Sequence, residues 1–187
     1  MPEYTRVTEV LDYFMEPWLV AWKVKVGARE ARRISTLALK VGTRVDELIK
    51  SHSKPTSKDS TEVKSCYEGF VKWDEDYRAQ WTTCVRLYDA TRMLTGEPDL
   101  YLKDSNTLLD IKCSGQINSK YWLQLSAYAS MMPLKPVNIA ILRLHKSIGE
   151  YEYKVKEFDE RLVDIFNGLL KAYNYLCPNG DKEGGAN

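Results

Sequence analysis

Apolar residues recur at helical spacing through the first fifty residues of the chain. This pattern predicts helix over residues 7–50, with breaks near Pro17 and Gly27, because proline and glycine interrupt helices. Between Ala28 and Ile49 the apolar positions fall within one arc of a helical wheel, which is typical of a helix that faces a core. The members of this arc are Ala31, Ile34, Leu37, Ala38, Val41, Val45, Leu48 and Ile49.

The rest of the chain mixes helical spacing with the alternation typical of strands. Helices are predicted over residues 61–79, 119–132 and 162–173, and strands over residues 81–88, 97–103, 107–112, 137–144 and 150–156. Residues 51–60 are predicted to form a loop and residues 103–106 a turn. This order gives helices, an antiparallel hairpin, a crossover helix and further strands. It predicts an α/β fold with a mixed sheet.

Composition narrows the class of protein. The 187 residues are 44% hydrophobic and 28% charged, which predicts a compact core, and we expect residues 1–178 to form a single domain. The Gly-rich, polar residues 179–187 are predicted to be disordered. No apolar run approaches the roughly 18 residues that a membrane span requires, so no membrane association is expected. The four cysteines are scattered without a CxxC pair, which predicts reduced thiols in a cytoplasmic protein.

Two aspartates are candidates for a metal site. If the loop of the predicted hairpin has two or four residues, paired positions have numbers that sum to 209, and Asp99 lies directly opposite Asp110. A three-residue loop shifts the sum to 210 and turns Asp99 to the other face. Facing carboxylates repel each other, and Mg²⁺, which favours carboxylate oxygens, would resolve the conflict. Lys112 shares a strand face with Asp110 and is a candidate catalytic ammonium. The alternative is that these residues serve a turn and a solvated ion pair.

The order of three short motifs resembles a known family. Gly96 and Asp99 form a Gly-x-x-Asp, Asp110-Ile111-Lys112 an Asp-x-Lys, and Gln124 with Tyr128 a Gln-x-x-x-Tyr. This series is similar to the PD-(D/E)XK nuclease superfamily, and within it to the RecB-type, lambda-exonuclease-like branch. The resemblance implies a restriction-endonuclease-like αβββαβ core with helices flanking a mixed sheet. It also implies a metal site where the sheet opens.

The resemblance assigns roles to these residues. Asp99 and Asp110 would bind Mg²⁺, with Mn²⁺ able to substitute, together with the backbone carbonyl of Ile111. Lys112 would orient or deprotonate the attacking water and stabilise developing negative charge. Gln124 and Tyr128, neighbours on one helix face, would act beside the metal or at a substrate phosphate. The alternative for Gln124 is a structural hydrogen bond from its buried amide to a strand backbone.

Relatives of this type often carry a histidine ligand on the first helix, in a Gly-[Ser/Thr]-x-x-His pattern. Here the segment reads Gly42-Thr43-Arg44-Val45-Asp46, so Asp46 occupies the histidine position. Its rival is the next residue, Glu47. Glu47 lies three residues from Arg44, where an exposed ion pair explains it, whereas Asp46 lies nearer the apolar arc. Asp46 is therefore the predicted additional metal ligand.

Basic residues form a stripe beside the apolar arc of the same helix. The stripe consists of Arg29, Arg33, Lys40 and Arg44. Between residues 23 and 44 the charged residues are seven basic and one acidic, although the net charge of the whole chain is only +1. This local excess predicts a DNA-phosphate contact surface. The alternative is an ordinary solvated helix face.

The favoured prediction is a Mg²⁺-dependent DNA exonuclease. The resemblance implies a role in phage or mobile-element recombination and DNA processing, with DNA, a single-strand annealing or recombination protein and further copies of the chain as candidate partners in the host cytoplasm. No iron–sulfur cluster is expected, because the clustered C-terminal cysteines that such a centre would need are absent. Two rival hypotheses are a structure-selective endonuclease, of the resolvase or restriction type, and a catalytically silent nucleic-acid-binding module.

Overall fold

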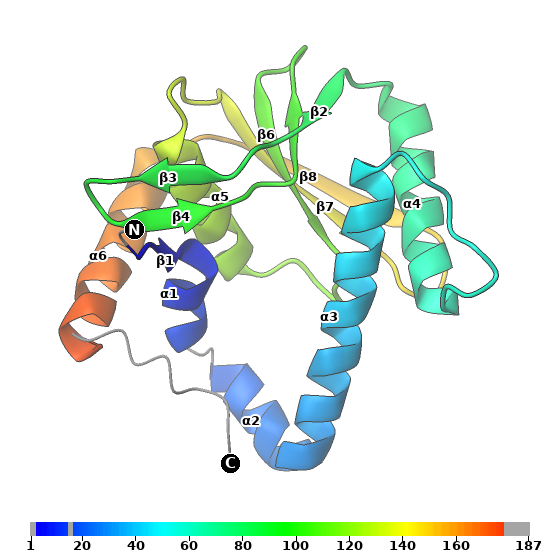
Figure 1. The fold of residues 1–187 in the computed structure, drawn as a ribbon, viewed down its shortest axis with the longest axis horizontal. Coiled ribbons are helices and arrows are strands. Elements are labelled where there is room, and N and C mark those ends of the chain that lie inside the picture. The colour runs from blue at the N-terminus through cyan, green and yellow to red at the C-terminus, as the bar shows by residue number, and fades with distance from the viewer. Residues whose placement is uncertain (1–2, 15–16, 178–187) are drawn as a thin grey trace.

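The structure is a computed structural model that describes residues 3–14 and 17–177 (Figure 1). Its helices are α1 (Val7–Tyr13), α2 (Pro17–Val26), α3 (Ala28–Lys50), α4 (Thr61–Tyr77), α5 (Ser119–Met131) and α6 (Glu160–Leu176). Its strands are β1 (Thr5–Arg6), β2 (Trp81–Thr83), β3 (Leu87–Asp89), β4 (Leu94–Gly96), β5 (Leu100–Leu102), β6 (Thr107–Lys112), β7 (Asn138–Leu144) and β8 (Tyr151–Glu157).

Two mixed sheets organise the chain. The larger sheet has the strand order β2-β5-β6-β7-β8, in which β6 and β7 are parallel and the other neighbours antiparallel. The parallel step requires a crossover, which α5 provides between β6 and β7. The smaller sheet has the order β1-β4-β3. The expected α/β architecture, with helices flanking a mixed sheet, is confirmed.

The central strands separate two hydrophobic clusters. Along β6, Leu108 packs with α1, α5 and α6, whereas Leu109 and Ile111 pack with α3 and α4 (Figure 1). Successive side chains of a strand point to opposite faces, so this alternation assigns Asp110 and Lys112 to the α5 side. Lys112 indeed lies over the ring of Tyr121 on α5. The predicted division of faces along this strand is confirmed.

Most predicted elements are present, including the helix breaks near Pro17 and Gly27, the loop over residues 51–60 and the four-residue turn over residues 103–106. Two strand predictions were too long. Residues 81–88 contain two short strands, β2 and β3, which belong to different sheets. Residues 97–103 contain only β5, because residues 97–99 carry the chain from the smaller sheet to the larger one. A change of sheet interrupts the hydrogen-bond ladder, and Pro98 has no amide proton to contribute to one.

The apolar arc of the first long helix is only partly buried. Ala31, Val45, Leu48 and Ile49 are buried, but Ile34 and Leu37 are 37% and 48% exposed. The N-terminal half of α3 extends with α2 beyond the edge of the larger sheet, so these side chains have no sheet to pack against (Figure 1). The prediction of a fully core-facing arc was therefore wrong for the N-terminal half. Ile165 of α6, also predicted to be apolar and buried, is 53% exposed.

The predicted disordered tail, residues 179–187, lies outside the described residues. Within residues 3–14 and 17–177, no helix is both long and apolar enough to cross a membrane.

Candidate active site

The β5–β6 hairpin brings Asp99 and Asp110 together. Leu100 pairs with Leu109 and Leu102 with Thr107, so paired positions sum to 209. The same register, continued by one residue, sets Asp99 against Asp110. Asp99 lies just before β5, and its Oδ2 accepts a hydrogen bond of 2.6 Å from the backbone N–H of Ile111. The sum of 209 is confirmed and the alternative of 210 is excluded.

Asp110 is almost completely buried. Its side chain is 2% exposed, and its Oδ2 forms an ion pair with the ammonium of Lys112. Beyond that ion pair, no hydrogen-bond donor of the described residues reaches this oxygen. A buried carboxylate with so few partners is costly unless a further cation or proton accompanies it.

The electrostatics of the pair follow from burial and repulsion. Burial, and then the negative charge of Asp110, raise the pKa of Asp99 to about 8. Burial acts to lower the pKa of Lys112, but the charges of Asp110 and Asp99 outweigh it and hold that pKa above its usual value. Without a metal, the site therefore holds a proton on its carboxylates and a charged ammonium at neutral pH.

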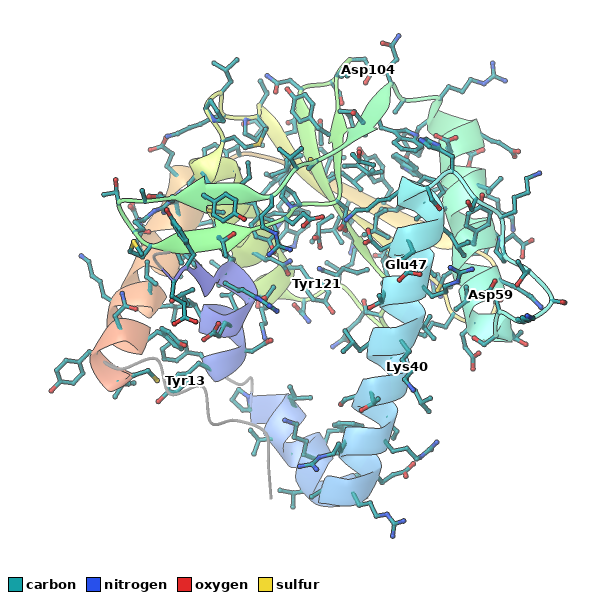
Figure 2. The ribbon with its side chains drawn as sticks, viewed as in Figure 1. Tyr13, Lys40, Glu47, Asp59, Asp104 and Tyr121 are labelled. Atoms are coloured by element: carbon teal, nitrogen blue, oxygen red, sulfur yellow. The ribbon has the colours of Figure 1, made fainter. Side chains whose placement is uncertain are left out.

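A cleft of about 470 Å³ opens beside these residues. Its lining comes from α3, from the residues around β6 and from Tyr121 and Gln124 of α5 (Figure 2). Oxygen donors in such a partly enclosed cleft suit a hard divalent cation. Among residues 3–14 and 17–177, however, no three side chains of His, Cys, Asp or Glu form a ready-made metal-binding group. Asp99 and Asp110 fit a metal ion only if a backbone carbonyl, such as that of Ile111, water or a shifted carboxylate completes the shell.

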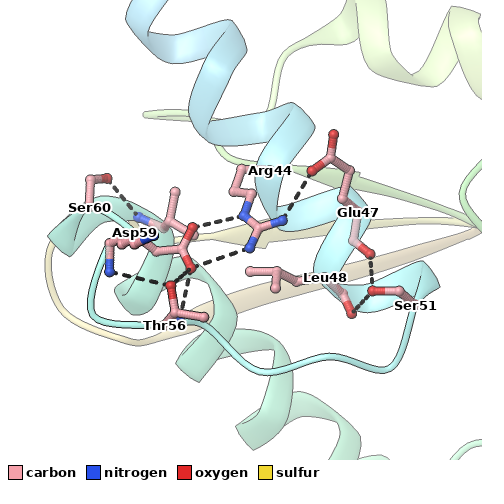
Figure 3. A network of polar contacts seen from close by, with 9 residues as sticks. Arg44, Glu47, Leu48, Ser51, Thr56, Asp59 and Ser60 are labelled. Carbon is pink, nitrogen blue, oxygen red and sulfur yellow. Dashed lines mark hydrogen bonds and ion pairs between the residues drawn. The ribbon is translucent and has the colours of Figure 1, made fainter.

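Asp46 and Glu47 of α3 differ as the sequence predicts. Asp46 lines the cleft. Its Oδ2 lies 3.1 Å from the Nζ of Lys50. Glu47 is exposed and forms an ion pair of 3.2 Å with Arg44 (Figure 3). Asp46 therefore lies on the side of α3 where a ligand is needed, and its role as a ligand stays a prediction.

Gln124 and Tyr128 form one buried unit on α5. The Gln124 amide donates a hydrogen bond of 3.0 Å to the Tyr128 hydroxyl, rather than bonding to a strand. Burial, and then the charge of Asp110, raise the pKa of Tyr128 to about 12, so the hydroxyl stays protonated. A Cβ added at Gly96 would lie 2.2 Å from Cε1 of Tyr128. The glycine and the tyrosine of the two motifs thus pack against each other, which gives both a structural role.

Two residues of the site were missed at the level of sequence. Glu97 lines the cleft and accepts ion pairs from Lys50 at 3.0 Å and from Arg86 at 3.0 Å. Lys50 also reaches Asp46. The spacing of four residues between Asp46 and Lys50 was the available signal, because such residues are neighbours on a helix. Nothing local indicated Glu97 as the second partner.

The basic stripe does not face the cleft. The cleft-lining residues of α3 are Ala38, Leu39, Gly42, Thr43 and Asp46. At 100° per residue, the centre of the stripe lies about 130° around the helix from the centre of this set. Arg33 pairs with Glu30 at 2.7 Å and Arg44 with Asp59 at 2.8 Å, the latter across the loop before α4 (Figure 3). Arg29 and Lys40 are exposed. DNA binding by this stripe stays a prediction.

A second hollow continues the cleft-facing side of α3 towards α2. It has a volume of about 600 Å³ and is lined by Lys23 and Arg32 among small and hydroxyl-bearing residues. On the helical wheel Ser35 and Arg32 lie on the same side of α3 as Asp46, within roughly 40°. Two cationic side chains therefore accompany the side of the helix that leads to the acid pair.

Solved structures share this fold. An alkaline exonuclease from Laribacter hongkongensis aligns with a TM-score of 0.56 over 95% of this chain and 89% of its own, at 12% identity. A phage-related exonuclease from Haemophilus somnus 129PT aligns with a TM-score of 0.52 over 97% and 98%, at 13% identity. A putative exonuclease from Eubacterium rectale reaches 0.56 over 78% and 69%, at 15% identity. No protein-family model and no curated protein sequence matches the chain. At these identities the likeness establishes the fold, and the fold is that of these exonucleases.

Proposed function

We propose that this protein is a metal-dependent DNA nuclease that hydrolyses phosphodiester bonds, and that it acts as an exonuclease. The observation that carries the proposal is the pairing of Asp99 with Asp110 at the cleft, beside the ammonium of Lys112. Repelling carboxylates on a buried strand face do not stabilise a fold, and their placement calls for a cation. The exonuclease fold of the neighbours supports the same chemistry.

Each residue has a definite task in this proposal. Asp99 and Asp110 hold Mg²⁺ or Mn²⁺ together with the Ile111 carbonyl, and Asp46 approaches from α3. The ion supplies, when bound, activation of water and of the phosphate. Lys112 positions the attacking water and stabilises negative charge that develops on the phosphate oxygens. Its raised pKa favours these tasks over removal of a proton from the water.

Gln124 and Tyr128 act on the α5 side of the cleft. Gln124 lines the cleft, and its bond to the Tyr128 hydroxyl fixes the orientation of the amide. We assign Gln124 to contact a substrate phosphate or the water beside Lys112. Tyr128 acts through Gln124 and through its packing on Gly96.

The biological setting is part of the proposal. A phage-related exonuclease among the neighbours supports a role in phage or mobile-element recombination in the host cytoplasm. A single-strand annealing or recombination protein, or further copies of this chain, are the partners that such a role would use.

The decisive experiment compares linear, nicked and closed circular DNA in the presence of Mg²⁺ or EDTA. An exonuclease degrades linear DNA to short products, spares closed circles and stops working in EDTA. Cleavage of closed circles would favour the structure-selective endonuclease. Binding of DNA without any metal-dependent cleavage would favour the silent module.

A further inference from the structure

Lys50 lies among the acidic groups of the candidate active site. It is the last residue of α3, and its ammonium lies 3.1 Å from Asp46 Oδ2 and 3.0 Å from Glu97 Oε1. The carboxylate of Asp99 is also close enough to stabilise the charged form of Lys50. One ammonium therefore bridges the helix wall of the cleft and the segment that leads into β5.

Glu97 is held from both sides. Its Oε1 faces Lys50, and its Oε2 lies 3.0 Å from the guanidinium of Arg86. Neither oxygen of Glu97 is left for a metal ion while these ion pairs persist. Asp46 is bound to Lys50 through Oδ2, so only its Oδ1 lies outside that ion pair.

Lys50 remains charged at neutral pH. Burial acts to lower its pKa, but the bonds to Glu97 and Asp46 outweigh burial and raise it. The side chain is 28% exposed, so the ammonium is shielded from water without being sealed off. Such a cation is a permanent part of the site, whereas a divalent ion must bind from solution.

We propose that Lys50 takes the place of a second divalent cation, between Asp46 and Glu97, and limits the site to one ion at Asp99 and Asp110. This inference rests on the function proposed above. It makes Lys50 a positioning residue, which holds Asp46 beside the single ion and withdraws Glu97 from metal binding.

The charges around the cleft agree with a single ion. The carboxylates are Asp46, Glu97, Asp99 and Asp110, and the cationic side chains are Lys50, Arg86 and Lys112. With all of them ionised, this group carries one net negative charge. One divalent ion brings the group to +1, whereas a second would bring it to +3 in a partly buried cleft, where uncompensated charge is costly.

The test counts bound metal rather than turnover. Purified protein is titrated with Mn²⁺, and the free ion is followed by its electron paramagnetic resonance signal. The comparison includes the wild type, Lys50→Met, Lys50→Gln, Lys50→Arg and the exposed-lysine control Lys64→Met, all checked for folding by circular dichroism. Lys50→Gln is the second neutral variant, because its amide can still bond to the carboxylates if the methionine prevents folding.

The expected result is one Mn²⁺ per chain for the wild type, Lys50→Arg and Lys64→Met, and two for the neutral variants. Adding Glu97→Gln to Lys50→Met should return the count to one. Two ions in the wild type, or one ion in both neutral variants, would overturn the role of Lys50. A wild type that binds no ion, or whose ion survives Asp110→Asn, would instead overturn the proposed function.

Discussion

The two sides of the cleft are built in different ways. On the sheet side, the register of a short hairpin fixes Asp99 against Asp110, and only Lys112 offsets their charge directly. On the helix side, Asp46 and Arg44 of α3 already have ion-pair partners in Lys50 and Asp59. The sheet side therefore carries uncompensated charge in a rigid frame, and the helix side carries compensated charge on a helix that extends beyond the sheet.

This difference separates chemistry from adjustment. Charge that the fold leaves uncompensated is where a cation and a reacting phosphate gain most, because preorganised electrostatics is a large term in catalysis. Compensated charge on α3 can change with smaller consequences. Substitutions on the sheet side should therefore have the larger effects.

The largest effect is expected at Asp110 and Lys112. Asp110→Asn and Lys112→Ala should each lower metal-dependent hydrolysis by about 10²–10³-fold or more, because each removes a charge aimed at the reacting groups. The measurement is the initial rate on linear DNA, with circular dichroism to show that the fold survives. Cleavage at the wild-type rate by both folded variants would remove the chemistry from the sheet side.

The packing beneath the sheet side should also be sensitive. Gly96→Ala would drive a methyl group into the Tyr128 ring and should destabilise the protein by about 1–3 kcal/mol, the usual cost of overpacking. Gly42 of α3 is the matched control, because an added Cβ there meets nothing within 4 Å. Gly42→Ala should be neutral or stabilising by up to about 1 kcal/mol, since alanine favours helix. Urea unfolding measures both, and equal stabilities would contradict the close contact.

Asp99 should make the stability of the metal-free protein depend on pH. Its folded-state pKa is about 8, above the ordinary value of 3.8. Between these values the folded state binds more protons than the unfolded state, so its stability falls as pH rises from about 4 to 8. Asp99→Asn removes this loss and keeps an acceptor for the Ile111 amide. In EDTA the variant should gain at least about 1 kcal/mol over the wild type between pH 5 and pH 8.5, the equivalent of one unit of pKa. A pH-independent difference between the two would show that burial does not strain this carboxyl.

On the helix side, neighbouring residues should respond unequally. Asp46→Asn should weaken Mn²⁺ binding by about tenfold, a change typical of a group that orients or completes a metal shell. Glu47→Gln should leave the affinity unchanged, because Glu47 is exposed and pairs with Arg44. The reverse ranking would move the helix contribution to Glu47.

The smallest effect is expected from the basic stripe. Joint removal of Arg29, Arg33 and Lys40 should flatten the salt dependence of DNA binding by about 0.7–0.9, the value of one phosphate contact, because Arg33 is already paired. Arg32→Ala, on the cleft-facing side of α3, should produce the same change alone. An unchanged salt slope in the triple variant would leave the stripe as ordinary helix surface.

The sequence determined the parts of the fold that depend on near neighbours. Helical spacing, the breaks at Pro17 and Gly27 and the four-residue turn are local, and the turn alone fixes the register that pairs Asp99 with Asp110. Spacing on the helix also separated Asp46 from Glu47 correctly. These features follow from periodicity and turn length, which a sequence displays directly.

The tertiary structure decided what depends on distant segments. Strand-forming residues are alike in either sheet, so the changes of sheet at residues 84–86 and 97–99 had no local mark. The apolar spacing of Ile34 could not reveal that the sheet ends before reaching it. Lys50 and Glu97 are 47 positions apart, and only the packing of α3 beside the hairpin brings them together. Charge compensation is a property of neighbours in space, and for this reason the sequence alone identified the acid pair but not the cation that confines it.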